Sequence, residues 1–128
     1  MKPELTLLLW SVALAFVQVL IAVQGGMMQV GLPTLAGNRE PQPEFTGWAG
    51  RAQRAQRNMI ENLLPFAALV LVAVVAGKTN ANTLLGAQLF FWGRVAYAAV
   101  YLAGIPWLRT GVWFVSVIGM ILIFVQLL

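Results

Sequence analysis

The chain has 128 residues, of which 60% are hydrophobic and only 9% are charged. Ordinary soluble domains carry about a quarter charged residues, so this composition excludes a typical soluble domain. A membrane-spanning helix needs about 20 apolar residues, and the length leaves room for four such helices with short connections. Cysteine and histidine are both absent from the sequence. Their absence removes protein thiol nucleophiles, disulfides, imidazole bases and the usual zinc or haem ligands.

The first apolar segment lies near the start of the chain. Between Glu4 and Arg39 stand 34 uncharged residues, which predict a membrane helix over about 4–31. Lys2 precedes the run, but a signal peptide has an apolar core of about 7–15 residues, so we expect a retained span. Residues 32–50 hold three of the six prolines, and we expect an aqueous loop there because such a segment cannot satisfy its backbone in hydrocarbon.

Three further helices follow from the spacing of charges and turn residues. The sequence predicts a second helix over about 51–77, a third over about 82–104 after the polar turn KTNAN, and a fourth over about 107–128 after Pro106. The predicted fold is therefore an all-α integral membrane protein, a single domain over 1–128 that forms a four-transmembrane-helix bundle.

The positive charges predict how the chain crosses the membrane. Five arginines belong to the side that holds the first and third connections, whereas Lys2 and Lys78 belong to the other side. By the positive-inside rule the first loop is cytoplasmic, so both termini face the non-cytoplasmic side. The net charge of +4 is explained by contacts with anionic lipid headgroups, and we expect no nucleic-acid partner. The five arginines are Arg39, Arg51, Arg54, Arg57 and Arg109.

The second predicted helix carries a polar face within the membrane. At 100° per residue, its polar residues fall within an arc of about 120°. Arg51 and Arg54 could simply reach the headgroups, as long side chains at helix ends do. Glu61 lies about 15 Å deeper than Arg51, so its carboxylate must be paired, protonated or exposed to a wet cavity. The face comprises Arg51, Arg54, Arg57, Asn58 and Glu61.

A matching face is expected on the third helix, formed by Arg94, Tyr97 and Tyr101. Counting along the two antiparallel helices places Arg94 level with Glu61, which makes them candidate partners. The same count places Asn58 level with Tyr97, and Arg54 level with Tyr101. Such a buried pair could serve packing alone. However, four arginines would face a single carboxylate, and this surplus of positive charge favours an anionic, hydrogen-bonding ligand.

A further cation stands in the first turn of the last helix. Arg109 and the neighbouring Thr110 lie where free backbone amides and the helix dipole also attract anions. This arrangement could cradle a thiolate, a carboxylate or another oxyanion. Contact with a lipid phosphate is the alternative interpretation.

Two segments, RAQRAQRNMIENLLPF and FFWGRVAYAAVYLAGIPWLR, resemble the signature of the MAPEG family, the membrane-associated proteins of eicosanoid and glutathione metabolism. The sharpest feature is an Arg-Ala-x-x-Asn-x-x-Glu pattern, matched by Arg54, Ala55, Asn58 and Glu61. The resemblance implies a homotrimer of four-helix subunits that binds glutathione at the subunit interfaces. The chain is most similar to the short bacterial members, which implies a bacterial inner membrane.

The resemblance also implies roles for individual residues. Arg109 would match the arginine that stabilises the glutathione thiolate, which makes it the expected catalytic residue. Arg39, in the first loop, would contact a glutathione carboxylate from a neighbouring subunit's side of the site. No metal is expected. The remaining expected glutathione-site residues are Arg51, Arg54, Gln56, Arg57, Asn58, Glu61, Arg94, Tyr97, Tyr101 and Thr110.

These inferences lead to one preferred function and two alternatives. We expect a microsomal-type glutathione transferase or peroxidase that acts on lipophilic electrophiles, with membrane lipids, a lipophilic substrate and further copies of the chain as partners. A non-catalytic lipid- or partner-binding module of the same family would share these residues. A small multidrug exporter is disfavoured because it needs an ionisable carboxylate on its pathway, usually in the first span. The first helix offers only Gln18 and Gln24 as strongly polar side chains.

Overall fold

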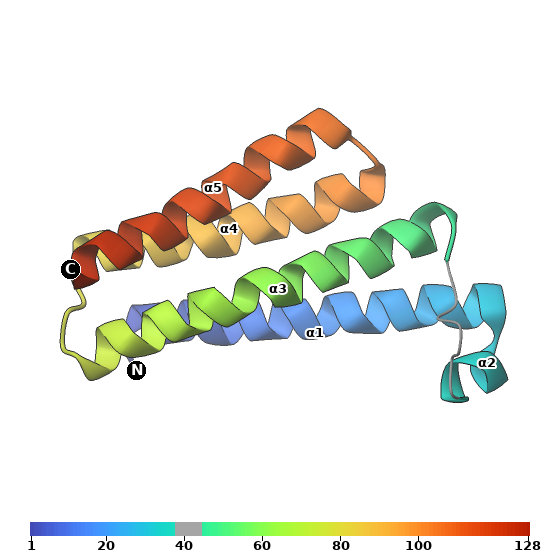
Figure 1. The fold of residues 1–128 in the computed structure, drawn as a ribbon, viewed down its shortest axis with the longest axis horizontal. Helices are drawn as coiled ribbons and strands as arrows, with labels where there is room; N and C mark the ends of the chain where they lie inside the picture. The colour runs from blue at the N-terminus through green and yellow to red at the C-terminus, as the bar shows by residue number, and fades with distance from the viewer. Residues whose placement is uncertain (38–44) are drawn as a thin grey trace.

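The structure is a computed structural model that describes residues 1–37 and 45–128, and over these residues it contains helices and no strands. Four long helices run along the length of the molecule, and a short one follows the first of them (Figure 1). The bounds are α1 Pro3–Val30, α2 Leu32–Ala36, α3 Gly47–Val75, α4 Ala81–Ala103 and α5 Pro106–Leu127.

The two ends of the bundle differ in what they hold. The N-terminus, the C-terminus and the connection between α3 and α4 lie together at one end, which we call the terminal end (Figure 1). Helix α2, the start of α3 and the turn between α4 and α5 lie at the opposite end, which we call the turn end. Both termini are thus at the same end of the bundle, because four long helices run alternately up and down it.

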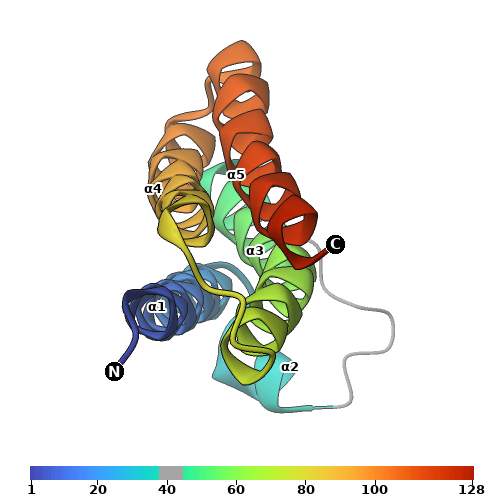
Figure 2. The same cartoon turned by 90° about the vertical axis from the view of Figure 1, so that its left-hand side faces the viewer.

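The long helices pack mainly as two pairs, α1 with α3 and α4 with α5. Seen from the terminal end, α1 and α5 lie on opposite sides of the molecule (Figure 2). The α4–α5 contact is close because small residues face each other across it. A Cβ atom built on Gly86 would lie 2.5 Å from the carbonyl oxygen of Gly119, and one on Gly93 would lie 3.1 Å from the amide nitrogen of Ser116. Small residues permit this approach, as they do between many membrane helices.

The ends of α4 are set by local sequence. Asn80 caps its first turn and forms a reciprocal capping box with Thr83, which satisfies backbone donors that the helix leaves unpaired. At the other end Gly104 adopts a left-handed conformation with φ 78°, which a residue without a side chain accepts at little cost. Pro106 then stands in the first turn of α5, where its missing N–H is not needed. This short connection brings the start of α5 back beside the end of α4.

Polar contacts close the terminal end. The Thr83 hydroxyl contacts the buried carboxylate of Glu4 at 2.7 Å, which ties α1 to the start of α4. The Asn80 amide donates to the Gln126 side chain at 3.0 Å, and the Lys78 ammonium donates to the carbonyl oxygen of Leu127 at 3.1 Å. These contacts join three helices at the end opposite to the arginines.

The first connection differs from the predicted loop over 32–50. Residues 32–36 form α2, and α3 begins at Gly47 rather than near Arg51. The helix extends further because Ala49 is fully buried against α1 at Gly25, where an added Cβ would lie 2.7 Å from that of Ala49. Packing between helices, which a charge pattern does not report, therefore sets this boundary.

Three helices, α1, α3 and α5, are long and apolar enough to cross a membrane. The fourth predicted span, α4, is not among them. Its 23 residues exceed the about 20 needed for a span, but asparagine, glutamine, arginine and tyrosine side chains lower its hydropathy. Arg94, Tyr97 and Tyr101 are nevertheless buried inside the bundle.

The close α4–α5 contact predicts a specific loss of stability. Gly86→Ala should lower the free energy of unfolding by about 1–3 kcal/mol, because an added methyl group forces the two backbones apart. Gly111→Ala is the matched control, since it lies within α5 and its added Cβ would meet nothing within 4 Å. Thermal unfolding in detergent, followed by circular dichroism, measures both. Equal unfolding temperatures for the two variants would contradict the close contact.

Candidate functional site

Three helices enclose a polar hollow in the turn-end half of the bundle. The hollow has a volume of about 170 Å³. Its walls come from α3, α4 and α5, and the short turn after Gly104 joins α4 to α5 there. Four of its five lining residues carry an amide, a hydroxyl or a guanidinium group, and the fifth carries an indole. They are Asn58 from α3, Tyr97 from α4, and Arg109, Thr110 and Trp113 from α5.

Arg94 lies directly behind this hollow. Its side chain is only 1% exposed, and its Nη1 donates to the Asn58 carboxamide oxygen at 2.9 Å. The guanidinium carbon also lies 4.1 Å from the centre of the Tyr97 ring. The Nε and Nη2 atoms are buried and have no hydrogen-bond partner in the described structure. A full positive charge is therefore held in the interior by a neutral amide and an aromatic face.

A second group of arginines surrounds Tyr101. The Nε of Arg54 donates to the Tyr101 hydroxyl at 3.1 Å, and the guanidinium carbon of Arg109 lies 4.6 Å from the centre of the Tyr101 ring. Tyr97 and Tyr101 themselves pack with ring centres 5.5 Å apart. One turn nearer the start of α3, the Nε of Arg51 donates to the carbonyl oxygen of Leu102 at 3.0 Å. All of these contacts join arginines to neutral groups.

The predicted pairing of Arg94 with Glu61 is wrong. The one protein acceptor of Arg94 in the described structure is Asn58, one turn closer to the turn end, and Glu61 is exposed on the surface of the chain. Counting residues gives the level of each Cα atom but not where a long side chain extends. Arg54 and Tyr101, which were also expected at the same level, are joined by a direct hydrogen bond.

Among the described residues, the expected site residues Gln56, Arg57 and Glu61 do not line the hollow. Gln56 is half-buried, and Arg57 is exposed on the same helix as Glu61. Arg39 lies outside the described residues. Within one chain the structure therefore brings part of the expected set together and leaves the other part on the surface of α3.

Sequence reasoning missed two residues of this site. Trp113 lines the hollow and lies four residues after Arg109, so helical spacing could have placed both on one face. Asn62 donates to the Asn58 carboxamide oxygen at 3.2 Å and lies four residues after it. In both cases the spacing of four residues in the sequence was the signal that could have identified the residue.

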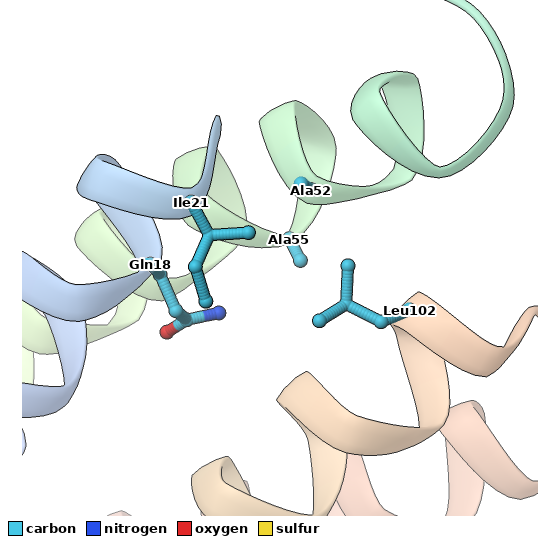
Figure 3. A pocket seen from close by; sticks show the side chains of 5 residues that line it. All are labelled: Gln18, Ile21, Ala52, Ala55 and Leu102. Atoms are coloured by element: carbon cyan, nitrogen blue, oxygen red, sulfur yellow. The ribbon is translucent and has the colours of Figure 1, made fainter. Parts of the chain in front are cut away.

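A second, much smaller space lies between α1, α3 and α4 (Figure 3). It measures about 10 Å³, which is close to the volume that a single water centre requires. Gln18 reaches it from α1, and its carboxamide oxygen is buried without a partner in the described structure. The other walls are apolar, and the space is too small to hold an organic ligand. The residues around it are Gln18, Ile21, Ala52, Ala55 and Leu102.

The chemistry of the larger hollow is that of a donor-rich site. A guanidinium, a threonine hydroxyl, a carboxamide and a tyrosine hydroxyl line it, and another guanidinium lies behind Asn58. No group of three or more residues that could hold a metal ion occurs within residues 1–37 and 45–128. The arrangement suits an anionic or strongly hydrogen-bond-accepting ligand.

Comparison with known proteins decides the family. A model of the MAPEG family matches residues 7–128, nearly the whole chain. The chain belongs to the MAPEG family. The expected resemblance is therefore confirmed. Membership of this membrane family and three helices long and apolar enough to cross a membrane identify an integral membrane protein. The MAPEG family includes glutathione transferases and related proteins. Searches of curated proteins and of solved structures found no match.

The buried charge of Arg94 predicts an unusual stability effect. Replacing a buried, poorly paired ion by an apolar residue of similar volume is often neutral, or stabilising by about 1–4 kcal/mol. Arg94→Met should therefore unfold at the same temperature as the wild type or at a higher one when no ligand is present. Arg51→Met is the matched control, since it removes a paired, half-buried arginine, and it should be destabilised by about 1 kcal/mol. A large loss of stability in Arg94→Met alone would show that the protein itself compensates this charge.

Proposed function

We propose that this MAPEG protein binds glutathione and uses its thiolate against lipophilic electrophiles, as a membrane glutathione transferase or peroxidase. The observation that carries the proposal is the group of arginines around one hollow, whose contacts with the described residues are all to neutral groups. Guanidinium groups within a membrane are costly unless a negative charge or strong acceptor accompanies them. An anionic peptide supplies both.

The size of the hollow supports a site shared between copies of the chain. Pockets that enclose a small organic ligand usually measure about 300–1,000 Å³, whereas this hollow has about 170 Å³. A tripeptide therefore fits only in part, and its remainder would lie along α3 over Arg54, Arg57 and Glu61, which are exposed. A neighbouring subunit would cover that part. We propose a homotrimer on this basis and on that of the family.

Each residue of the hollow has a role in this proposal. Arg109 and Thr110 would hold the sulfur, because a guanidinium favours the charged form of a thiol and so lowers its pKa. Asn58, Tyr97 and Tyr101 would bind the peptide, with Arg54, Gln56, Arg57 and Glu61 along the exposed part. When bound, glutathione supplies the nucleophile that the protein lacks.

The electrophile is expected to arrive from the lipid. Trp113 forms an apolar wall beside Arg109, and the outer surface of α5 is apolar. With a halonitrobenzene, a carbon–sulfur bond would form and the halide would leave with its electron pair. The protein's part in this step is to keep the sulfur ionised and placed.

The same proposal covers the membrane arrangement. Helix α4 crosses the bilayer as a fourth span. Its 23 residues are enough to span the hydrocarbon core, and the charged side chain of Arg94 is buried inside the bundle. The turn end carries the arginines, so it faces the cytoplasm and both termini face outward. In a bacterial cell this would be the inner membrane.

The role of Arg109 gives the first test of this function. Arg109→Ala should lower kcat/KM for conjugation of a halonitrobenzene by about 100-fold, the effect of removing one donor from an anion-stabilising site. It should also remove the ultraviolet absorbance of the thiolate while glutathione still binds in calorimetry. Lys78→Met, which removes a cation at the terminal end, is the control and should behave as the wild type. Full activity of Arg109→Ala would exclude its catalytic role, and binding without a thiolate signal in the wild type would favour a non-catalytic module.

The exposed carboxylate of Glu61 gives a test of assembly. A charged group facing lipid within a span is costly, so we expect a cation of a neighbouring copy to cover it. Glu61→Leu should shift the protein from trimer towards monomer in native mass spectrometry from detergent micelles. Val75→Ala changes an exposed residue at the far end of the same helix and should leave the trimer intact. A wild type that is monomeric in several mild detergents would contradict the proposed assembly.

A further inference from the structure

The carboxamide of Asn58 stands between Arg94 and the hollow. Its oxygen accepts hydrogen bonds from the Nη1 of Arg94 at 2.9 Å and from the Nδ2 of Asn62 at 3.2 Å. An amide oxygen has two lone pairs, so both of its acceptor positions are used on the side away from the hollow. The amide nitrogen of Asn58 has no acceptor among the described residues, and Asn58 lines the hollow.

The orientation of this amide is forced by its neighbours. The guanidinium of Arg94 contains only donors, and the group that Asn62 presents is also a donor. The reversed amide would place its own NH₂ group against both donors, which would leave the Nη1 of Arg94 unpaired and set dipole against charge. Asn62 would keep its hydrogen bond to the backbone carbonyl oxygen of Asn58 at 2.8 Å. Arg94 therefore determines which end of the Asn58 amide enters the hollow.

Arg94 does this from a position that a ligand does not reach. The side chain is 1% exposed. Asn58, its hydrogen-bond partner, and Tyr97, whose ring it lies over, both line the hollow and separate it from Arg94. Its place in the fold is thus different from that of Arg109, whose side chain lines the hollow directly.

We propose that Arg94 is a positioning residue that locks the Asn58 amide with its NH₂ group in the hollow, so that the ligand group beside Asn58 must be a hydrogen-bond acceptor. A peptide carbonyl or carboxylate oxygen satisfies this condition, and a peptide N–H or an ammonium group does not. The proposal rests on the proposed function, since it specifies how the same hollow selects its peptide ligand.

A double-mutant cycle tests this proposal with the full chain in detergent and glutathione as the titrated probe. Arg94→Met should weaken glutathione binding by about 10-fold, because the released amide can present its oxygen to an acceptor. In an Asn58→Ala background the same substitution should have no further effect, because Arg94 then has no amide to orient. Arg94→Lys, which keeps a donor, should recover part of the affinity. An equal loss in the Asn58→Ala background would overturn the proposal.

The polarity of the amide is tested by Asn58→Asp. Its carboxylate still accepts from Arg94 but turns an acceptor oxygen towards the hollow. Binding should therefore fall by more than about 10-fold while the unfolding temperature stays equal or rises. Glutathione affinity that is unchanged by Asn58→Asp would show that no acceptor of the ligand lies there. Lys78→Met again serves as the control for the loss of a distant charge.

A measurement without ligand separates this inference from the proposed function. In nuclear magnetic resonance of the ¹⁵N-labelled protein, the Asn58 side-chain NH₂, assigned by its loss in Asn58→Asp, should show contacts to protons of Thr110 or Trp113. Contacts to the guanidinium protons of Arg94 instead would overturn the locked orientation. If the wild type binds no glutathione at millimolar concentration, the proposed function fails, and this spectrum still decides the orientation.

Discussion

A guanidinium group buried in a membrane protein keeps its charge, and without water around it the compensation must come from protein groups or from a ligand. Arg94 places this constraint at the centre of the bundle. It is 1% exposed and has one hydrogen-bonded protein partner, a neutral amide, among the described residues. The aromatic face of Tyr97 adds a cation–π contact, and such a contact contributes about 2 kcal/mol or more where water is excluded. These contacts hold the group in place and leave its charge available to attract an anion nearby.

The rest of the fold brings further donors to the same place. The short turn through Gly104 and Pro106 returns the chain, so the first turn of α5 lies beside the end of α4. Glycines at 86 and 119 let α4 and α5 approach closely towards the terminal end. Beside the turn, Arg109 lies over the ring of Tyr101. The terminal end is joined separately by Glu4 and Thr83. The arginine-rich half of the MAPEG bundle can therefore serve a ligand while the opposite half supplies the connections between helices.

The sequence predicted the helical, membrane-embedded fold because apolar length and the positions of charges report it directly. It also predicted the level of Arg54 with Tyr101, since helical rise is nearly constant. It did not predict the partner of Arg94, because a long side chain can reach a full turn along a neighbouring helix. The early start of α3 depends on packing at Ala49 and Gly25, and the orientation of Asn58 depends on two neighbours from different turns and helices. The contact of Ala49 with Gly25 and that of Asn58 with Arg94 join residues far apart in the chain and leave no local pattern in the sequence, whereas Asn58 and Asn62 are an i, i+4 pair.

The central claim is that the arginine-lined hollow stabilises a bound negative charge on sulfur. The most direct measurement is the pH dependence of thiolate absorbance for glutathione bound to the wild-type protein. A free thiol has a pKa of about 8.5, and the account predicts that the bound thiol titrates at least about one unit lower, because guanidinium groups favour its charged form. A bound thiol that titrates at or above the value of free glutathione would contradict the account.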